Sequence, residues 1–421
     1  MNSYKIKKYK LVKYIIYLII ATNMGIMKVF SLHESFTYFM VVGNILFGIL
    51  LNIYCYSSKS VLHTINKFCP TAFKANVVLV LFLLFEIFWT KFFFRVSIKS
   101  VVLNSGYYWV ILLFLPLIYV LIHDGEAQII RELVFLAAFI QICRFLSWYA
   151  YNISGIMVFP EMIGEYSDQW VRSGYKRMLD TCLLGIEFPF LSYLVLIKSN
   201  FSKKILPAFM LALCFVFAFI VTASRAMNIC CIGTVLLMFT FKRSSLDKRF
   251  VRLFVIFVTF AVIFNSSVFQ NFLDGILNSS SPNYGTTLIR FQAYTYYLDV
   301  LASHWAGGLG FSDGITPYLI QLNHGAGGYF YVSDLGFVGT VIKFGIPGLI
   351  LIIYTFLLAV NKLKRTAYSV DNILFLGLFV FFFLTGMLSN SIFDTQRVLC
   401  YPILLAVFVF DQDYCNNALN E

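Results

Sequence analysis

Long apolar runs recur along the whole chain and are separated by short polar segments. Most of these runs approach the roughly 20 residues that an α-helix needs to cross about 30 Å of hydrocarbon. They cover residues 11–30, 36–56, 76–94, 107–122, 132–151, 179–197, 205–223, 226–241, 251–269, 335–360, 372–388 and 398–410. Because lipid offers no hydrogen-bond partners to the backbone, each run is expected to be helical. The pattern predicts an all-α polytopic integral membrane bundle of about twelve transmembrane helices, forming a single transmembrane domain over residues 1–421.

One segment interrupts this pattern. Residues 271–334 are polar, aromatic and glycine-rich, and they separate the ninth run from the third-last one. A segment this hydrophilic between membrane spans must face water. It is therefore predicted to be one long extracytoplasmic, periplasmic loop and the first place to look for chemistry.

Composition supports the membrane interpretation and limits the function. Apolar residues make up 60% of the chain and charged residues 12%, and the mean hydropathy is +0.81. These values lie outside the range of soluble globular domains. The nine cysteines avoid the long polar segment, and no phosphate loop, dinucleotide fingerprint or metal-ligand spacing is present. No cofactor and no metal are expected.

The net charge of +12 follows the predicted topology. Basic residues precede the first apolar run and recur in every second polar segment, for example at residues 198–204, 242–252 and 362–365. Under the positive-inside rule these segments are cytoplasmic, and so are both termini. The excess charge therefore sets orientation among membrane lipids and does not indicate nucleic-acid binding.

A few arginines lie on the opposite, outer side, where positive charge needs a local reason. They are Arg172, Arg177, Arg225, Arg290 and Arg397. Each alone could reach lipid head groups or pair with a nearby carboxylate. Together in one cavity they would suit a pyrophosphate, because guanidinium groups bind phosphate oxygens in a bidentate manner.

Aromatic and ionisable side chains of the polar segment extend this prediction. Tyr294, Tyr297 and Trp305 present flat apolar faces with polar edges, which suit sugar rings, although such residues also form interfacial belts. Asp334 and His324 are candidates for the group that accepts a proton from an attacking hydroxyl. A solvated loop histidine without such a role is the alternative for His324.

Three motifs then resemble a known family. Thr222-Ala-Ser-Arg-Ala-Met-Asn is similar to the Ser-Arg motif of the O-antigen polymerase and ligase superfamily. Arg290-Phe-Gln-Ala-Tyr followed by Trp305-Ala-Gly-Gly-Leu-Gly-Phe resembles its next segment, and the glycine-punctuated run around Gly345 resembles the helix after its outer loop. The resemblance covers about residues 222–360.

The resemblance implies an inner-membrane glycosyltransferase of bacteria that needs no metal. In a polymerase, a growing glycan leaves undecaprenyl pyrophosphate and joins the terminal sugar of the next lipid-linked repeat unit. The family's arginines are thought to hold the pyrophosphate, which implies this role for Arg225 and Arg290, and a chain-length regulator protein is an implied partner. Held cations stabilise the charge that develops on the leaving group.

The position of one acidic residue separates the branches of this superfamily. Ligases carry a histidine about eleven residues before the Gly-x-x-Gly of the helix after the loop, and that position here is Asp334. This departure favours an O-antigen polymerase over a ligase that joins glycan to lipid A core. A flippase or transporter of lipid-linked oligosaccharide is the alternative outside the enzymes. A lipid-phosphate-sugar transferase using Glu34 is a further one.

Overall fold

Residues 2–30, 35–164, 171–172, 174–178, 182–197, 201–242, 284–325, 327–369, 371–388, 392–395 and 397–411 are described by the computed structural model. The first part contains α1 (Asn2–Asn23), η1 (Ile26–Phe30), α2 (Ser35–Ser57), α3 (Lys59–Phe68), α4 (Thr71–Phe93), α5 (Ile98–Asn104), η2 (Gly106–Leu113), α6 (Phe114–Asp124), α7 (Glu126–Ser154) and α8 (Pro160–Gly164). The label η marks 3-10 turns, except that η4 below is a π turn.

The second part begins with the two-stranded antiparallel pair β1 (Val171–Arg172) and β2 (Tyr175–Lys176). It continues with α9 (Leu184–Ile197), η3 (Phe201–Lys203), α10 (Ile205–Val216), η4 (Phe217–Val221), α11 (Arg225–Phe241), α14 (Tyr284–His304), α15 (Pro317–His324), η5 (Val332–Leu335), α16 (Gly336–Arg365), α17 (Asn372–Leu388) and α18 (Cys400–Val409). Apart from the short strand pair, the regular elements described are helical.

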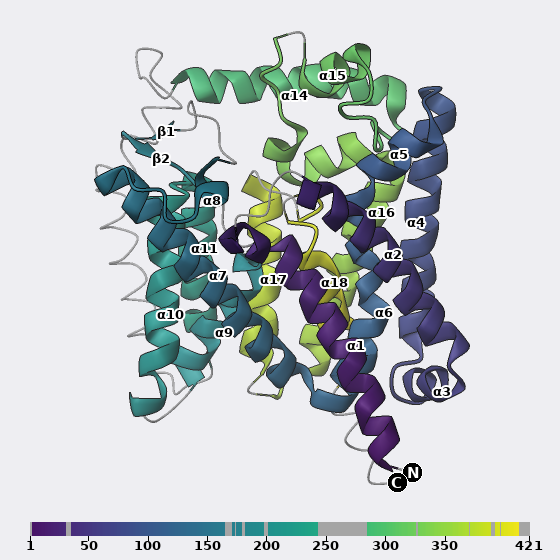
Figure 1. Ribbon diagram of the computed structural model, residues 1–421, viewed down its shortest axis with the longest axis vertical. Coiled ribbons are helices and arrows are strands. Elements are labelled where there is room, and N and C mark those ends of the chain that lie inside the picture. The colour runs from purple at the N-terminus through teal and green to yellow at the C-terminus, as the bar shows by residue number, and fades with distance from the viewer. Residues whose placement is uncertain are drawn as a thin grey trace.

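The helices form one bundle, and α14 and α15 lie across one end of it (Figure 1). We call this the outer end. Helix α1 begins and α18 ends at the opposite end, so both described ends of the chain lie on the same side of the bundle. All ten residues of α18 are buried, and α6 is buried from Phe114 to Leu121. These two helices therefore form the centre of the core.

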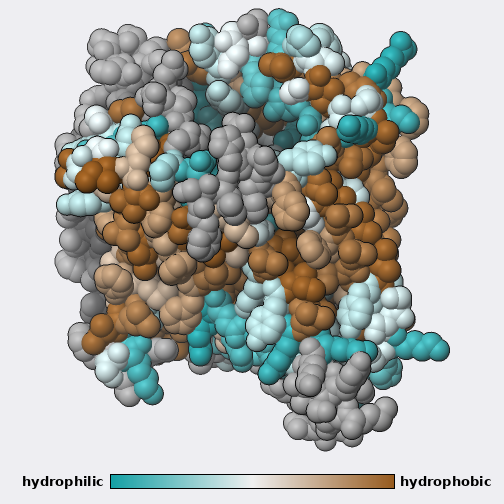
Figure 2. All heavy atoms as spheres, viewed as in Figure 1, coloured by the Kyte–Doolittle hydropathy of each residue, from teal (hydrophilic) through white to brown (hydrophobic). Residues whose placement is uncertain are grey.

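The surface agrees with a membrane environment. Figure 2 shows an apolar band around the middle of the bundle, with hydrophilic residues above and below it. In the described part, five helices are long and apolar enough to cross a membrane: Tyr38–Ser57, Thr71–Phe93, Gly106–Asp124, Ser202–Val221 and Val332–Arg365. Four shorter apolar helices accompany them. The protein is an all-α polytopic membrane protein, as predicted.

The predicted runs match helices closely. Eleven of the twelve apolar runs coincide with helical elements, and the run at residues 251–269 lies outside the described residues. The polar segment at 271–334 is more regular than a loop, because its described part from Tyr284 onward contains α14, α15 and η5. Its polar composition concealed these helices, since they lack the long apolar run that marks a span.

Candidate functional site

Helix α16 is broken near its outer end. Gly345 has φ 54° and ψ −140°, a conformation outside any helix and strongly disfavoured for residues with a Cβ atom. Two residues later, Pro347 has no N–H to donate to the carbonyl of Lys343, which would be its helical partner. The break therefore leaves backbone groups inside the bundle that need partners from elsewhere.

The turn after α14 supplies these partners. Three pairs of backbone groups close the junction: Leu309 N donates to Ile342 O at 3.1 Å, Gly310 N to Lys343 O at 2.6 Å, and Ile346 N to Trp305 O at 3.1 Å. The Trp-Ala-Gly-Gly-Leu-Gly motif is thus a docking turn that fits into the gap in α16. We call residues 305–310 the docking turn.

Helix α4 holds the docking turn from its other side. Trp89 Nε1 donates to Gly308 O at 3.0 Å, and Phe311 N donates to Thr90 Oγ1 at 3.0 Å. A Cβ atom on Gly310, whose φ is +57°, would lie 2.1 Å from Thr90 Oγ1. The docking turn is therefore held in one position between the two membrane helices α4 and α16.

Two cavities adjoin this junction and share Asp313, Lys343 and Thr395. The first has a volume of about 300 Å³ and is also lined by His324, Tyr331 and Asp394. The second has a volume of about 410 Å³ and is also lined by Tyr38, Asn104, Tyr107 and Tyr108. Sugar-sized space and polar side chains thus meet at the outer end of the bundle, on both sides of Lys343.

Asp313 and His324 form a pair at these cavities. His324 Nε2 lies 3.0 Å from Asp313 Oδ1, and His324 Nδ1 lies 3.1 Å from the carbonyl oxygen of Phe330. Both ring nitrogens thus face oxygen acceptors, an arrangement that orients the imidazole firmly. Helix α15, which carries His324, is capped by Thr316, whose Oγ1 accepts a hydrogen bond from Leu319 N at 3.2 Å.

Three of the predicted arginines act electrostatically on Asp334. The carboxylate of Asp334 interacts electrostatically with the guanidinium groups of Arg290, Arg397 and Arg177, and with Asp394. Arg290 itself is exposed on α14. Three arginines that are far apart in the sequence thus share one electrostatic partner, the aspartate at the position where ligases carry histidine. We call Arg177, Arg290, Arg397 and Asp334 the arginine cluster.

Arg177 also ties this cluster to the start of α11. Its Nε donates to Thr222 O at 2.7 Å, and Met178 N donates to Val221 O at 3.3 Å. After Ala223, which has a positive φ of 48°, Ser224 caps α11 and Arg225 is its first residue. The backbone of the Ser-Arg motif therefore lies beside the arginine cluster. The side chains of Arg172 and Arg225 lie outside the described residues.

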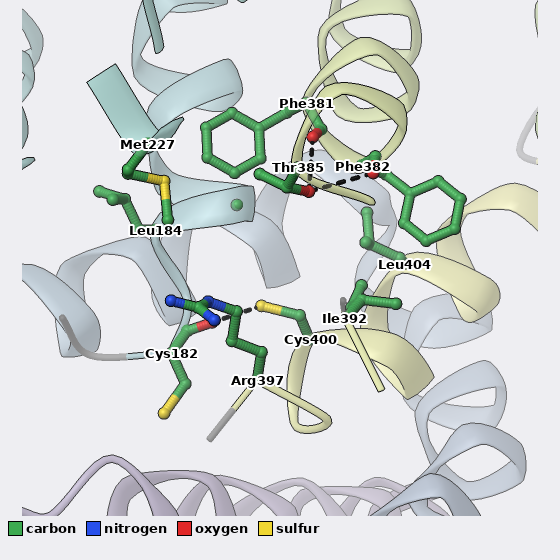
Figure 3. A pocket seen from close by; sticks show the side chains of 11 residues that line it. Cys182, Leu184, Met227, Phe381, Phe382, Thr385, Ile392, Arg397, Cys400 and Leu404 are labelled. Carbon is green, nitrogen blue, oxygen red and sulfur yellow. Dashed lines mark hydrogen bonds between the residues drawn. The ribbon is translucent and has the colours of Figure 1, made fainter. Parts of the chain in front are cut away.

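Arg397 lies three residues before the start of α18, and its side chain points into the bundle. Figure 3 shows its guanidinium group pointing toward Cys182 and Leu184, in a narrow cavity of about 30 Å³. Its Nη1 lies 3.7 Å from Asp394 Oδ2, and both side chains are largely buried. Asp394 also lines the first cavity, so it connects that cavity with the arginine cluster.

The aromatic residues predicted to contact sugar differ in their surroundings. Tyr297 is fully buried, its hydroxyl donates to Asn323 O, and burial raises the pKa of its phenol above the usual range. Trp305 is 59% exposed, and Tyr294 is half-buried. Within the predicted set, Tyr294 and Trp305 therefore retain accessible surface, whereas Tyr297 packs α14 against α15.

Sequence reasoning missed two residues that line both cavities. Lys343 lies within the apolar run at residues 335–360, and Asp313 lies in a stretch with no periodic pattern. The ammonium group of Lys343 lies 5.0 Å from the ring centre of Tyr108. The signal that could have found Lys343 is its place two residues before the glycine that breaks α16.

A comparison with models of protein families shows what part of the chain is similar to a known family. The model of a family described as O-antigen ligase matches residues 208–353. This segment is therefore similar to the O-antigen ligase family. The matched segment includes Arg225, Arg290, the docking turn and the break in α16. It overlaps most of residues 222–360, over which the motifs resemble the same family. Among curated proteins, none matches the chain.

Proposed function

We propose that this protein is a polymerase of O-antigen or a related surface polysaccharide. It transfers a growing glycan from undecaprenyl pyrophosphate to the terminal sugar of a lipid-linked repeat unit, at the outer face of the inner membrane. The observation that carries the proposal is the cluster of Arg290, Arg177 and Arg397 around Asp334, within and beside the segment that matches the family.

The cluster fits the demand of the leaving group. When the bond between the anomeric carbon and the phosphate oxygen breaks, charge grows on the pyrophosphate, and fixed guanidinium groups stabilise it more in the transition state than in the ground state. Asp334 balances part of the charge of these arginines. Arg225 is proposed to join them, since the Ser-Arg motif begins beside Arg177.

The attacking hydroxyl needs a proton acceptor, for which the sequence offers Asp334 and His324. Their surroundings restrict both. Asp334 interacts with three guanidinium groups, and each ring nitrogen of His324 faces an oxygen atom. The tyrosine and tryptophan side chains with accessible surface, Tyr294 and Trp305, are proposed to contact sugars of the growing glycan.

The test replaces Arg290 by glutamine in cells that lack the chromosomal copy of the gene. Arg95, which is also exposed at the outer end of α4, provides the control Arg95→Gln. Loss of one cation at the leaving group is expected to reduce transfer by about 100-fold or more. Long glycan chains should disappear on gels in Arg290→Gln and persist in Arg95→Gln at equal protein levels. Normal long chains in Arg290→Gln would refute the role of this arginine.

A ligase is the second candidate, because the matching family model carries that description. The two functions differ in the phenotype of a deletion. Loss of a polymerase leaves single repeat units on the lipid A core, whereas loss of a ligase leaves the core without repeat units. Movement of intact carrier across vesicles without bond formation would instead support a transporter.

A further inference from the structure

We propose that the second cavity binds the terminal sugar of the acceptor, and that Asp313 takes the proton from its attacking hydroxyl. This inference rests on the proposed function, because it names the acceptor site and the general base of the same reaction. His324 is then a positioning residue, which acts through Asp313.

The lining of the second cavity suits a sugar. Three tyrosines, Tyr38, Tyr107 and Tyr108, contribute aromatic rings, and Asn104 and Thr395 contribute neutral polar groups. Aromatic faces pack against the apolar faces of sugar rings, and a few placed polar groups select among hydroxyls. Its volume of about 410 Å³ is enough for one or two sugar residues.

Asp313 lies where an acceptor hydroxyl and a donor could meet. It lines both cavities, and its side chain is 51% exposed, so a hydroxyl can reach it. Asp394, which lines the first cavity, lies 3.7 Å from Arg397 of the arginine cluster. A sugar in the second cavity would thus present its hydroxyl to Asp313 on the side that faces the donor.

The backbone that carries Asp313 is held from three helices. Thr90 on α4 accepts the hydrogen bond from Phe311 N, and Asn104 on α5 donates to the carbonyl oxygen of Asp313. On α15, Asn323 Nδ2 donates to Ser312 Oγ at 3.0 Å. General bases need such support, because a small misplacement of the reacting group costs rate steeply.

The neighbours of Asp313 favour it over the other candidates as the base. His324 faces it from α15, Lys343 from α16, and Tyr108 from η2, while Asp394 interacts with Lys343 from the far side of the first cavity. His324 fixes the carboxylate with one ring nitrogen and is itself fixed by the carbonyl of Phe330. The bond to His324 uses Oδ1 of Asp313, and the side chain that lines both cavities remains 51% exposed.

The step balances without any further reactant. The O–H bond of the acceptor breaks as its proton moves to a carboxylate oxygen of Asp313, and the hydroxyl oxygen forms a bond to the anomeric carbon of the donor. The bond from that carbon to the phosphate oxygen breaks, and the electron pair leaves with the lipid pyrophosphate. Asp313 then releases its proton to water.

The acceptor site also lies largely outside the family segment. Tyr38, Asn104, Tyr107 and Tyr108 all precede residue 208, where the match begins. The matched segment supplies Asp313 and Lys343. The choice of acceptor sugar is therefore assigned to residues of α2, α5 and η2, and the chemistry to the family segment.

The experiment uses purified full-length protein in nanodiscs. Lipid-linked repeat units extracted from cells lacking the protein serve as donor, and the acceptor is the repeat-unit oligosaccharide released by mild acid and labelled with a fluorophore. The labelled acceptor carries no pyrophosphate, so it cannot act as donor, and the KM for each substrate is measured separately. Rates are recorded across pH.

For the base, Asp313→Asn is compared with Asp313→Glu and with the control Asp299→Asn, an exposed aspartate on α14. A lost general base lowers kcat by about 10²- to 10⁴-fold. We expect this loss in Asp313→Asn with little change in either KM, partial recovery in Asp313→Glu, and normal rates in Asp299→Asn. His324→Asn should lower kcat by less and displace the acidic limb of the pH profile.

For the acceptor site, Tyr38→Ala is compared with Tyr318→Ala, an exposed tyrosine on α15. Tyr38→Ala should raise the KM for the labelled acceptor several-fold and leave the KM for the donor unchanged, while Tyr318→Ala changes neither.

The outcomes separate this inference from the proposed function. If the wild-type protein extends no acceptor, the function as a polymerase falls. If the wild-type protein is active, Arg290→Gln is inactive and Asp313→Asn retains kcat within threefold at every pH, the inference falls and the function stands. Should Asp313→Asn fold poorly, Asp313→Glu decides, because a wild-type kcat with the carboxylate moved by one methylene group overturns the role of Asp313.

Discussion

Gly310 offers a direct test of whether the docking turn holds the outer segment to the bundle. In Gly310→Ala the new Cβ atom would lie 2.1 Å from Thr90 Oγ1, so the turn must move away from α4. Gly314 is a matched control, because it also has a positive φ, of +73°, but open space where its Cβ would lie. Both variants carry the left-handed strain of about 1–2 kcal/mol, and they differ in the clash.

The difference between the two variants follows from the contacts that the clash breaks. Moving the turn would cost the hydrogen bonds from Phe311 N to Thr90 Oγ1 and from Gly310 N to Lys343 O. At about 1 kcal/mol each, their loss adds roughly 2 kcal/mol to the destabilisation in Gly310→Ala. A change of this size shifts a local opening equilibrium by about 30-fold.

Hydrogen–deuterium exchange measures this opening. Amides of residues 305–313 should exchange about 30-fold faster in Gly310→Ala than in Gly314→Ala, while those of α6 stay unchanged. Adding Thr90→Ala to Gly310→Ala removes the clashing oxygen and should restore part of the protection. Equal exchange in Gly310→Ala and Gly314→Ala would show that the crowding at Thr90 does not hold the turn.

Three further substitutions test other contacts. Trp89→Phe removes the hydrogen bond to the carbonyl of Gly308 and should lower the thermal stability in detergent by about 1 kcal/mol; an unchanged melting curve would contradict this. Lys362→Met leaves the buried carboxylate of Glu126, now 2.6 Å from the ammonium group, without its cation and should cost about 3–5 kcal/mol. The double variant with Glu126→Gln should recover part of that loss, and a double variant as unstable as Lys362→Met would argue against a charge effect. Tyr297→Phe should lower stability by about 1 kcal/mol and leave glycan length on gels unchanged, whereas shortened chains would indicate a role beyond packing.

Much of the bundle could be predicted from the sequence because each membrane helix carries its own signal. A run such as residues 372–388 is apolar enough to indicate a helix without knowledge of its neighbours, and α17 occupies those same residues. Helix α14 was harder to predict, because it lies at the polar end of the bundle and alternates aromatic and polar residues without a long apolar run.

The candidate site was only partly predictable for a related reason. The arginines were predicted from their sign, since cations are unusual on the predicted outer side, and three of them interact electrostatically with Asp334. Asp313 and Lys343 carry no such signal. Their importance depends on contacts of the docking turn and the residue after it with α4 and α16. The longest of these joins residues 221 apart in the sequence, and no local pattern encodes contacts of that range.

The gap in α16 also constrains how the protein is made. Backbone carbonyl groups without a hydrogen-bond partner cost free energy in hydrocarbon. Helix α16 is therefore unstable in lipid until the docking turn supplies partners at its break. Trp89, Thr90 and the docking turn all precede α16 in the chain, and ribosomes deliver them first. The segments that satisfy the backbone of α16 are therefore synthesised before α16 itself. If α16 were moved ahead of them in the chain, its broken backbone would be made before its hydrogen-bond partners.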